Sequence, residues 1–331
     1  MSNPPQIPTL PDSAGKPRPF WSVMIPTYQP KENFLRQTLE SVLQQAAGAD
    51  AMQIEVVDDC SPDVNVEEMV RAIAGTRVKV SRTPQNLGLA GGWNTCLERA
   101  RGQWVHLLHH DDFVLPGFYA RMRAVAEAHP EVALVACRSF SVDEQGVILN
   151  VSPRIPDMEA GGRAVKHFYY ANPLQCPGVV MRRKFYETHG GFRPDLLYTL
   201  DLEMWARAIG LEGGVVLPDV LACFRSSTES ATSRLKRSAD SLRDVERLIQ
   251  IYDERYPEYD RKISLFQLCE KTLDQARLFS KNGDNEAARA NWSYWRSNMP
   301  ITMRLLAFAN RLVLTIARRL IYQKRQIQAL I

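Results

Sequence analysis

The chain has 331 residues and a formal net charge of only +4 at pH 7, which argues against a nucleic-acid-binding protein. Its hydrophobic fraction of 45% and its charged fraction of 24% are usual for a soluble globular protein. The 6 cysteines form no CxxC pair and lie in apolar stretches. They predict reduced core thiols of a cytoplasmic protein rather than disulfides or a zinc site.

Residues 1–19 are rich in proline and lack the apolar region of a signal peptide, so they predict a disordered leader. Strand and helix patterns then alternate. In chain order they are a strand at 21–25, a helix at 32–45, a strand at 53–57, a helix at 66–74, a strand at 78–80, a helix ending at 101, a strand beginning at 105, a helix at 118–128 and a strand at 132–137. This alternation predicts an α/β fold with a largely parallel sheet.

The pattern changes in the second half of the chain. Short strands at 179–181 and 214–217 flank a helix at 201–209. Beyond about residue 233 the strand signals stop. Charged helical segments with a turn at 281–284 then predict a helical extension over 233–331. No apolar stretch has the length of a bilayer span.

Two of the predicted strands end in paired acids, Asp58-Asp59 and Asp111-Asp112. The carboxyl ends of parallel strands meet at one edge, where open α/β sheets bind ligands. Adjacent carboxylates repel each other, and a divalent cation such as Mg or Mn relieves that repulsion. One pair therefore suits a base or ribose and the other a metal ion on a diphosphate. The alternatives are an Asx turn for the first pair and a helix N-cap for one acid of the second.

Several segments, in this order, resemble the family-2 glycosyltransferases. They are the residues 22–28 (SVMIPTY), 56–61 (VVDDCS), 86–90 (NLGLA) and the acids at 111 and 112. The resemblance spans about 20–232 and implies a GT-A fold, followed here by the C-terminal helical extension. It implies inverting hexosyl or deoxyhexosyl transfer from a UDP- or dTDP-sugar with Mn or Mg as cofactor. The implied acceptor is a polysaccharide, a lipopolysaccharide or a lipid-linked glycan.

The resemblance also assigns roles to individual residues. It implies a donor site formed by Pro26, Thr27, Tyr28, Asp58, Asp59, Asn86, Gly88, Asn94 and Asp111. Asp112, with Asp111, would hold the metal. Asp201 falls on the position of the catalytic base, because a Gly-Gly-Phe segment at 190–192 precedes it and Arg207 follows six residues later. The alternative for Asp201 is a helix N-cap.

Three positions depart from the family pattern. His109 replaces the first acid of the DxDD motif, Trp93 stands where an arginine often precedes Asn94, and Ser227 replaces a histidine. His109 or His110 is a candidate replacement ligand. The alternative for each is a buried histidine whose hydrogen bonds are satisfied. These departures keep open a non-catalytic nucleotide-sugar-binding or membrane-docking module, and a nucleotidyltransferase is a further alternative.

The C-terminal residues carry arginines at a spacing of seven, at 304, 311, 318 and 325. This spacing drifts by only ~20° per step on a helix, so it predicts one basic stripe beside apolar residues. Such a helix suits an anionic membrane surface, which would place the protein peripherally on the inner face of the cell membrane. The alternative is a helix packed on the catalytic domain.

Overall fold

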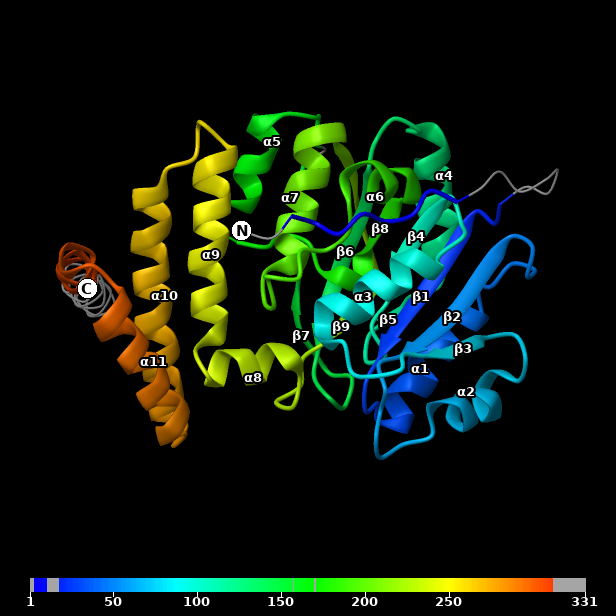
Figure 1. Cartoon of the computed structure of the whole chain (residues 1–331), viewed down its shortest axis with the longest axis horizontal. Helices are drawn as coiled ribbons and strands as arrows, with labels where there is room; N and C mark the ends of the chain where they lie inside the picture. The colour runs from blue at the N-terminus through cyan, green and yellow to red at the C-terminus, as the bar shows by residue number, and fades with distance from the viewer. Residues whose placement is uncertain (1–2, 11–17, 157, 170, 312–331) are drawn as a thin grey trace, which may run out of the picture. The chain divides into compact units, whose positions relative to one another are not determined.

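The structure is a computed structural model that describes residues 3–10, 18–156, 158–169 and 171–311. The chain divides into two compact units, residues 1–228 and residues 229–331. Unit 1 combines a sheet with helices, and the described part of unit 2 is helical (Figure 1).

The sheet of unit 1 has the strand order β3-β2-β1-β4-β8-β6-β9-β5, and β7 pairs with β6 outside this path. The strands are β1 (Trp21–Thr27), β2 (Met52–Asp58), β3 (Lys79–Arg82), β4 (Trp104–Leu107), β5 (Phe113–Val114), β6 (Leu134–Val142), β7 (Ile148–Val151), β8 (Val179–Arg182) and β9 (Gly214–Arg225). The predicted parallel pairing is confirmed for β1 with β2 and β4, and for β2 with β3. By contrast, β8 runs antiparallel to β4 and β6, so the sheet is mixed.

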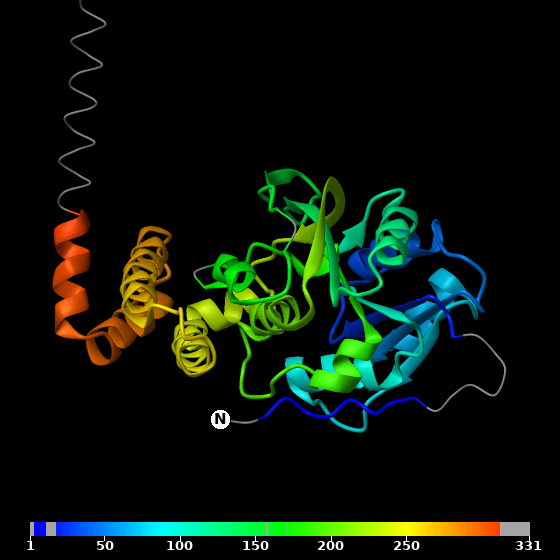
Figure 2. The same ribbon diagram turned by 90° about the horizontal axis from the view of Figure 1, so that it is seen from above.

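Helices pack on both faces of this sheet (Figure 2). The helical segments of unit 1 are α1 (Glu32–Leu43), α2 (Val66–Ala74), α3 (Gly88–Arg99), α4 (Phe118–Ala128), α5 (Gly162–Val165), η1 (Lys166–Phe168), η2 (Cys176–Gly178), α6 (Arg183–His189) and α7 (Leu200–Glu212). Apolar side chains of α1, α2 and α4 share one core with β1 and β2. Every residue of β1 and β2 is buried, as expected for central parallel strands covered on both faces.

Residues 3–10 pack on unit 1, in contrast to the disorder expected for the leader. Ile7 is fully buried, and the Gln6 side-chain amide donates to the Glu187 carbonyl at 2.6 Å. The Gly191 N–H donates to the Pro5 carbonyl at 2.8 Å. Prolines restrict the unfolded chain, so ordering this segment costs less entropy than its low apolar content suggests.

Unit 2 contains α8 (Ala231–Arg237), α9 (Asp240–Arg255), α10 (Arg261–Lys281), α11 (Asn285–Asn298) and a helical segment over 301–311. The predicted turn between α10 and α11 is confirmed. Gly283 adopts a left-handed backbone there, and Asp284 caps α11 by accepting the Ala287 N–H. Across the described ranges, we find no helix with both the length and the apolarity that crossing a bilayer demands.

Candidate active site

The two acid pairs lie at one edge of the sheet, as the sequence predicted. Thr27 at the end of β1 pairs with Asp58 at the end of β2. On the other side of β1, Met24 pairs with Leu107 at the end of β4. The segments that follow β2 and β4 therefore emerge on either side of the end of β1.

Both carboxylate oxygens of Asp58 have hydrogen-bond or ion-pair partners within unit 1. One carboxylate oxygen accepts the Ser61 N–H at 3.0 Å, and the other pairs with the Arg82 guanidinium. Because the side chain is 2% exposed, this geometry is that of the turn interpretation rather than of an open donor contact.

Asp59 anchors the glycine loop at the start of α3. Its carboxylate accepts the Leu87 N–H at 2.8 Å and the Gly88 N–H at 3.0 Å. The Asn86 side-chain amide donates to the Asp59 carbonyl at 3.2 Å. The structure thus brings together Asp59, Asn86 and Gly88, which were expected at the donor site from two separate segments.

The ends of β1 and β2 also carry unusual backbone. Gln29 and Cys60 have left-handed φ values of 49° and 59°, and the Gln29 N–H donates to the Ser61 hydroxyl at 2.8 Å. Such conformations cost energy and concentrate at functional sites. Thr27 is buried, whereas Tyr28 is 42% exposed beside this turn.

Asn94 has a structural contact where the resemblance implied a donor contact. Its amide nitrogen donates to the Phe192 carbonyl at 2.9 Å, and its amide oxygen accepts the Phe192 N–H at 2.8 Å. A Cβ on Gly191 would lie 2.2 Å from the Asn94 oxygen, so glycine is required at this close approach. Asn94 therefore joins α3 to the Gly-Gly-Phe turn.

Arg207 of α7 contacts both its own helix and the Gly-Gly-Phe turn at 190–192. Its guanidinium pairs with Glu203 at 3.0 Å and donates to the carbonyl of Gly191 at 2.7 Å and to that of His189 at 2.6 Å. Both side chains of the ion pair are 2% exposed. Arg207 thus fixes the turn against α7, which carries Asp201 in its first turn.

Replacing Arg207 by Leu is expected to destabilise unit 1 by about 3–5 kcal/mol, because Glu203 would stay buried without its ion pair to Arg207. Urea unfolding with an unchanged m-value would measure this loss. The matched control is Arg71→Leu, which breaks an exposed pair with Glu67 and should change stability by about 0.5 kcal/mol or less. Equal stability of the two variants would contradict the role assigned to Arg207.

The second acid pair lies in a candidate metal centre. Ligand atoms of His109, Asp111 and Asp112 all lie within 4.8 Å of one another. Asp112 is 1% exposed, and one of its oxygens accepts the Arg225 N–H at 2.8 Å. The other oxygen is buried without a hydrogen-bond partner among the described residues. Burial raises the pKa of Asp112. Its second oxygen faces His109 Nδ1 at 3.4 Å, and a buried carboxylate oxygen in this position fits a cation ligand.

Arg225 holds the loop that carries these acids, and no sequence motif indicated this role. Its guanidinium donates to the Asp111 carbonyl at 2.9 Å and to the Asp143 carbonyl at 3.0 Å. It also lies 4.3 Å from the centre of the Phe34 ring. The only signal in the sequence is an arginine at the end of a late strand, 113 residues from Asp112.

Asp201 lies in the first turn of α7, whose N-cap residue is Thr199, so Asp201 is not the N-cap. The Asn172 amide donates to its carboxylate at 2.8 Å. Burial raises the pKa of Asp201 to about 6, while the Leu202 N–H and the charge of His109 act in the opposite direction. This links Asp201 electrostatically to the candidate metal centre and makes it a group that can exchange a proton near neutral pH.

The chain has the GT-A fold, and unit 1 contains a glycine loop held by Asp59, an acidic cluster at 109–112 and the carboxylate of Asp201. Residues 22–189 match the model of glycosyl transferase family 2, and the chain belongs to that family.

Two of the proteins that are similar to this chain are bacterial proteins of polysaccharide biosynthesis. The amylovoran biosynthesis glycosyltransferase AmsE of Erwinia amylovora is 29% identical over 65% of this chain and 79% of that protein. The succinoglycan biosynthesis protein ExoO of Rhizobium meliloti is 32% identical over 58% of this chain and 47% of that protein.

Solved structures share the fold at lower identity. Staphylococcus aureus TarS 1–349 in complex with UDP-GlcNAc aligns with a TM-score of 0.57 and 18% identity over 87% of this chain and 79% of that one. The mannosyltransferase PcManGT of Pyrobaculum calidifontis, in complex with GDP-Man and Mn²⁺, gives a TM-score of 0.51 and 18% identity over 90% of this chain and 81% of that one.

Proposed function

We propose that unit 1 transfers a hexosyl or deoxyhexosyl group, with inversion, from a UDP- or dTDP-sugar to a hydroxyl of a polysaccharide, lipopolysaccharide or lipid-linked acceptor. The observation that carries this proposal is the combination of the cluster of His109, Asp111 and Asp112 with the separate carboxylate of Asp201. Support also comes from the bacterial relatives, whose names place them in amylovoran and succinoglycan biosynthesis.

Asp201 is the general base in this mechanism. Its carboxylate takes the proton of the acceptor hydroxyl as the oxygen attacks the anomeric carbon of the sugar. The new carbon–oxygen bond forms as the bond to the nucleoside diphosphate breaks, in line and on the opposite side of the ring. The Asn172 amide, which donates to Asp201 at 2.8 Å, orients the carboxylate for this transfer.

Asp112 and Asp111 would hold the divalent cation. Mn or Mg at this position would neutralise the charge that develops on the leaving nucleoside diphosphate. Arg225 fixes the loop that carries these acids, because its N–H donates to the Asp112 carboxylate and its guanidinium donates to the Asp111 backbone carbonyl. Asp59 fixes the Asn86–Gly88 loop in the same way on the donor side.

A thermal-shift screen of nucleotide sugars with Mn²⁺ would identify the donor, because a ligand that binds the folded state raises Tm. The proposal predicts stabilisation by at least one UDP- or dTDP-sugar. Stabilisation of about 2.7 kcal/mol is expected at a ligand concentration of about 100 Kd. Failure of every nucleotide sugar and of UDP to shift Tm would contradict a donor site.

The pH dependence of kcat should follow the ionisation of the Asp201 carboxyl. The pKa of this carboxyl is raised to about 6, so the base form is present above that pH and is lost as the pH falls through it. With saturating donor and metal, kcat should rise about tenfold per pH unit below about 6 and level off above it. A wild-type kcat that stays flat between pH 5 and pH 8 would rule out a base with this pKa.

Unit 2 supports a separate proposal of membrane docking. In the helical segment 301–311, Leu305 and Ile301 are 62% and 60% exposed, and Leu306 and Phe308 are also exposed. The arginines of this segment are turned toward the unit itself. Arg311 pairs with Asp274 at 2.8 Å, and Arg304 lies 5.5 Å from the Trp295 ring.

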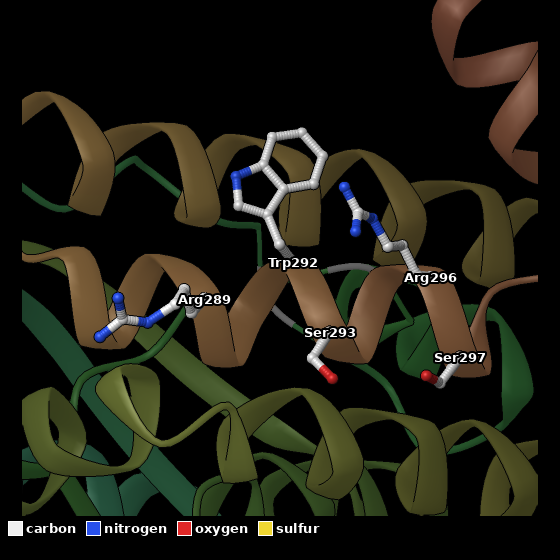
Figure 3. A pocket seen from close by; sticks show the side chains of 5 residues that line it. All are labelled: Arg289, Trp292, Ser293, Arg296 and Ser297. Carbon is white, nitrogen blue, oxygen red and sulfur yellow. The ribbon is translucent and has the colours of Figure 1, made fainter.

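Only two members of the expected arginine stripe lie among the described residues. Its members at 304 and 311 contact unit 2, and those at 318 and 325, with the rest of 312–331, lie outside the described residues. Exposed positive charge comes instead from α11. Arg289 and Arg296 flank Trp292 on one face and line a pocket of about 400 Å³ (Figure 3).

We propose that this basic and aromatic face of α11 and the exposed apolar residues of 301–311 contact anionic lipid together. Basic residues contribute about 1 kcal/mol each near such a surface, and a large exposed apolar patch favours burial. An aromatic contact joins the two segments, because the Phe308 and Trp295 ring centres are 5.6 Å apart and those of Trp295 and Trp292 are 5.7 Å apart.

Replacing both Leu305 and Phe308 by Glu should release the full-length protein from vesicles that contain anionic lipid. Co-sedimentation measures the loss, and Leu149→Glu is the matched control because Leu149 is an equally exposed leucine in unit 1. Neutral vesicles should bind the wild-type protein more weakly. Wild-type protein that stays in the supernatant, or that dimerises through this face instead, would contradict the docking proposal.

A further inference from the structure

Two residues that depart from the family pattern, His109 and Trp93, contact each other in the structure. Their ring centres are 4.8 Å apart at an angle of 32°. Trp93 is buried on α3 and also packs edge-on against Phe192, with 4.9 Å between the ring centres. The His109 imidazole therefore packs against the ring of a buried tryptophan.

His109 and Asp112 lie close enough together to bind the same metal ion. His109 Nδ1 is 3.4 Å from Asp112 Oδ2. Neighbouring ligands of one ion, each about 2.0–2.2 Å from it, lie roughly 3 Å apart. Asp111 offers an oxygen to the same cluster. Asp112 Oδ2 is buried without a further hydrogen-bond partner among the described residues, and the thiol of Cys176 is the other polar group beside His109.

The neighbouring histidines are placed differently. His106 is fully buried with both ring nitrogens in contact, one with the Tyr119 hydroxyl at 3.0 Å and one with the Pro177 carbonyl at 3.1 Å. His110 directs Nδ1 to the Pro26 carbonyl at 3.4 Å and does not belong to the acidic cluster. His106 thus fits the interpretation of a satisfied core histidine, whereas His109 faces the carboxylate of Asp112 and the thiol of Cys176.

We propose that His109 is a nitrogen ligand of the cation site and sets its selectivity. Imidazole binds first-row transition metals better than Mg²⁺, which prefers oxygen ligands. The site should therefore prefer Mn²⁺ and Co²⁺ to Mg²⁺, with Co²⁺ bound more tightly than Mn²⁺. This inference rests on the proposed metal-dependent transfer and names the ligand set of the same centre.

Pulsed electron paramagnetic resonance of Mn²⁺ bound to the full-length protein, with and without UDP, tests this assignment directly. A coordinated imidazole gives a ¹⁴N modulation of the electron spin echo, and labelling the histidines with ¹⁵N should change it. The modulation should disappear in His109→Asp, which keeps a ligand at this position, and should persist in the matched control His110→Gln. The preference for Mn²⁺ over Mg²⁺ in competition should fall about tenfold or more in His109→Asp.

Bound Mn²⁺ without a ¹⁴N modulation in the wild-type protein would overturn the proposal, as would a modulation that survives in His109→Asp. No binding of Mn²⁺ with or without UDP would also overturn it. The labelled wild-type protein gives the answer even if the variant does not fold. Nitrogen-coordinated Mn²⁺ in a protein that transfers no sugar would instead refute the proposed function and leave the ligand assignment intact.

Discussion

Replacing Asp201 by Asn is expected to lower kcat by about 10²–10⁴-fold and to leave donor affinity nearly unchanged. A general base acts only as the acceptor proton moves. Its loss therefore raises the free energy of the transition state and leaves that of the bound ground state nearly unchanged. The amide of Asn keeps the shape of the side chain and can still contact Asn172, which now donates to the carboxylate at 2.8 Å. Steady-state kinetics and donor titration on the same preparation separate the two effects.

The matched control for this variant is Asp219→Asn. Asp219 is a surface carboxylate of unit 1 that pairs with Arg121 at 3.1 Å, so its replacement should leave kcat and donor affinity unchanged. If Asp201→Asn loses donor binding while its residual kcat is normal, Asp201 is a donor contact and the base must be another group.

Asp112→Asn is expected to abolish metal-dependent turnover. The substitution removes one charge from the cluster but keeps an oxygen that can accept the Arg225 N–H, so the local fold should persist. Loss of a ligand charge should weaken Mn²⁺ binding by roughly 100-fold or more. Titration of Mn²⁺ into wild-type and variant protein, followed by both binding and turnover, measures the change.

Asp50→Asn serves as the control for this second variant because Asp50 is an exposed aspartate far from the strand ends at the site. Its titration curve should superimpose on that of the wild-type protein. Unchanged activity of Asp112→Asn at limiting Mn²⁺ or Mg²⁺ would remove Asp112 from the metal centre.

The features that the sequence predicted correctly depend on local pattern. Apolar runs that end in acids predicted strands with their carboxyl ends at one edge, and the register of β1 with β2 and β4 confirms this placement. A run of residues can specify where a strand ends because burial and turn formation are decided within a few positions.

The features that the sequence could not predict depend on contacts between distant segments. No sequence pattern predicted the contact of the Asn94 amide with Phe192, 98 residues away. The direction in which Arg304 and Arg311 point was likewise decided by Asp274 and Trp295 of neighbouring helices, not by the helical spacing. Spacing gives the face of a helix on which a residue lies, but the partner that covers that face is a tertiary property.

The central claim is that this chain transfers sugar from a nucleotide donor in a reaction that needs both a metal and Asp201. The most direct measurement is the release of UDP or dTDP from a panel of their sugars with a glycan acceptor. It is made with Mn²⁺ and with a chelator, on the wild-type protein and on Asp201→Asn. The wild-type protein is expected to release UDP or dTDP only with metal, at a rate at least about 100-fold above that of Asp201→Asn. Release that is unaffected by the chelator, or equal in the two proteins, would contradict the central claim.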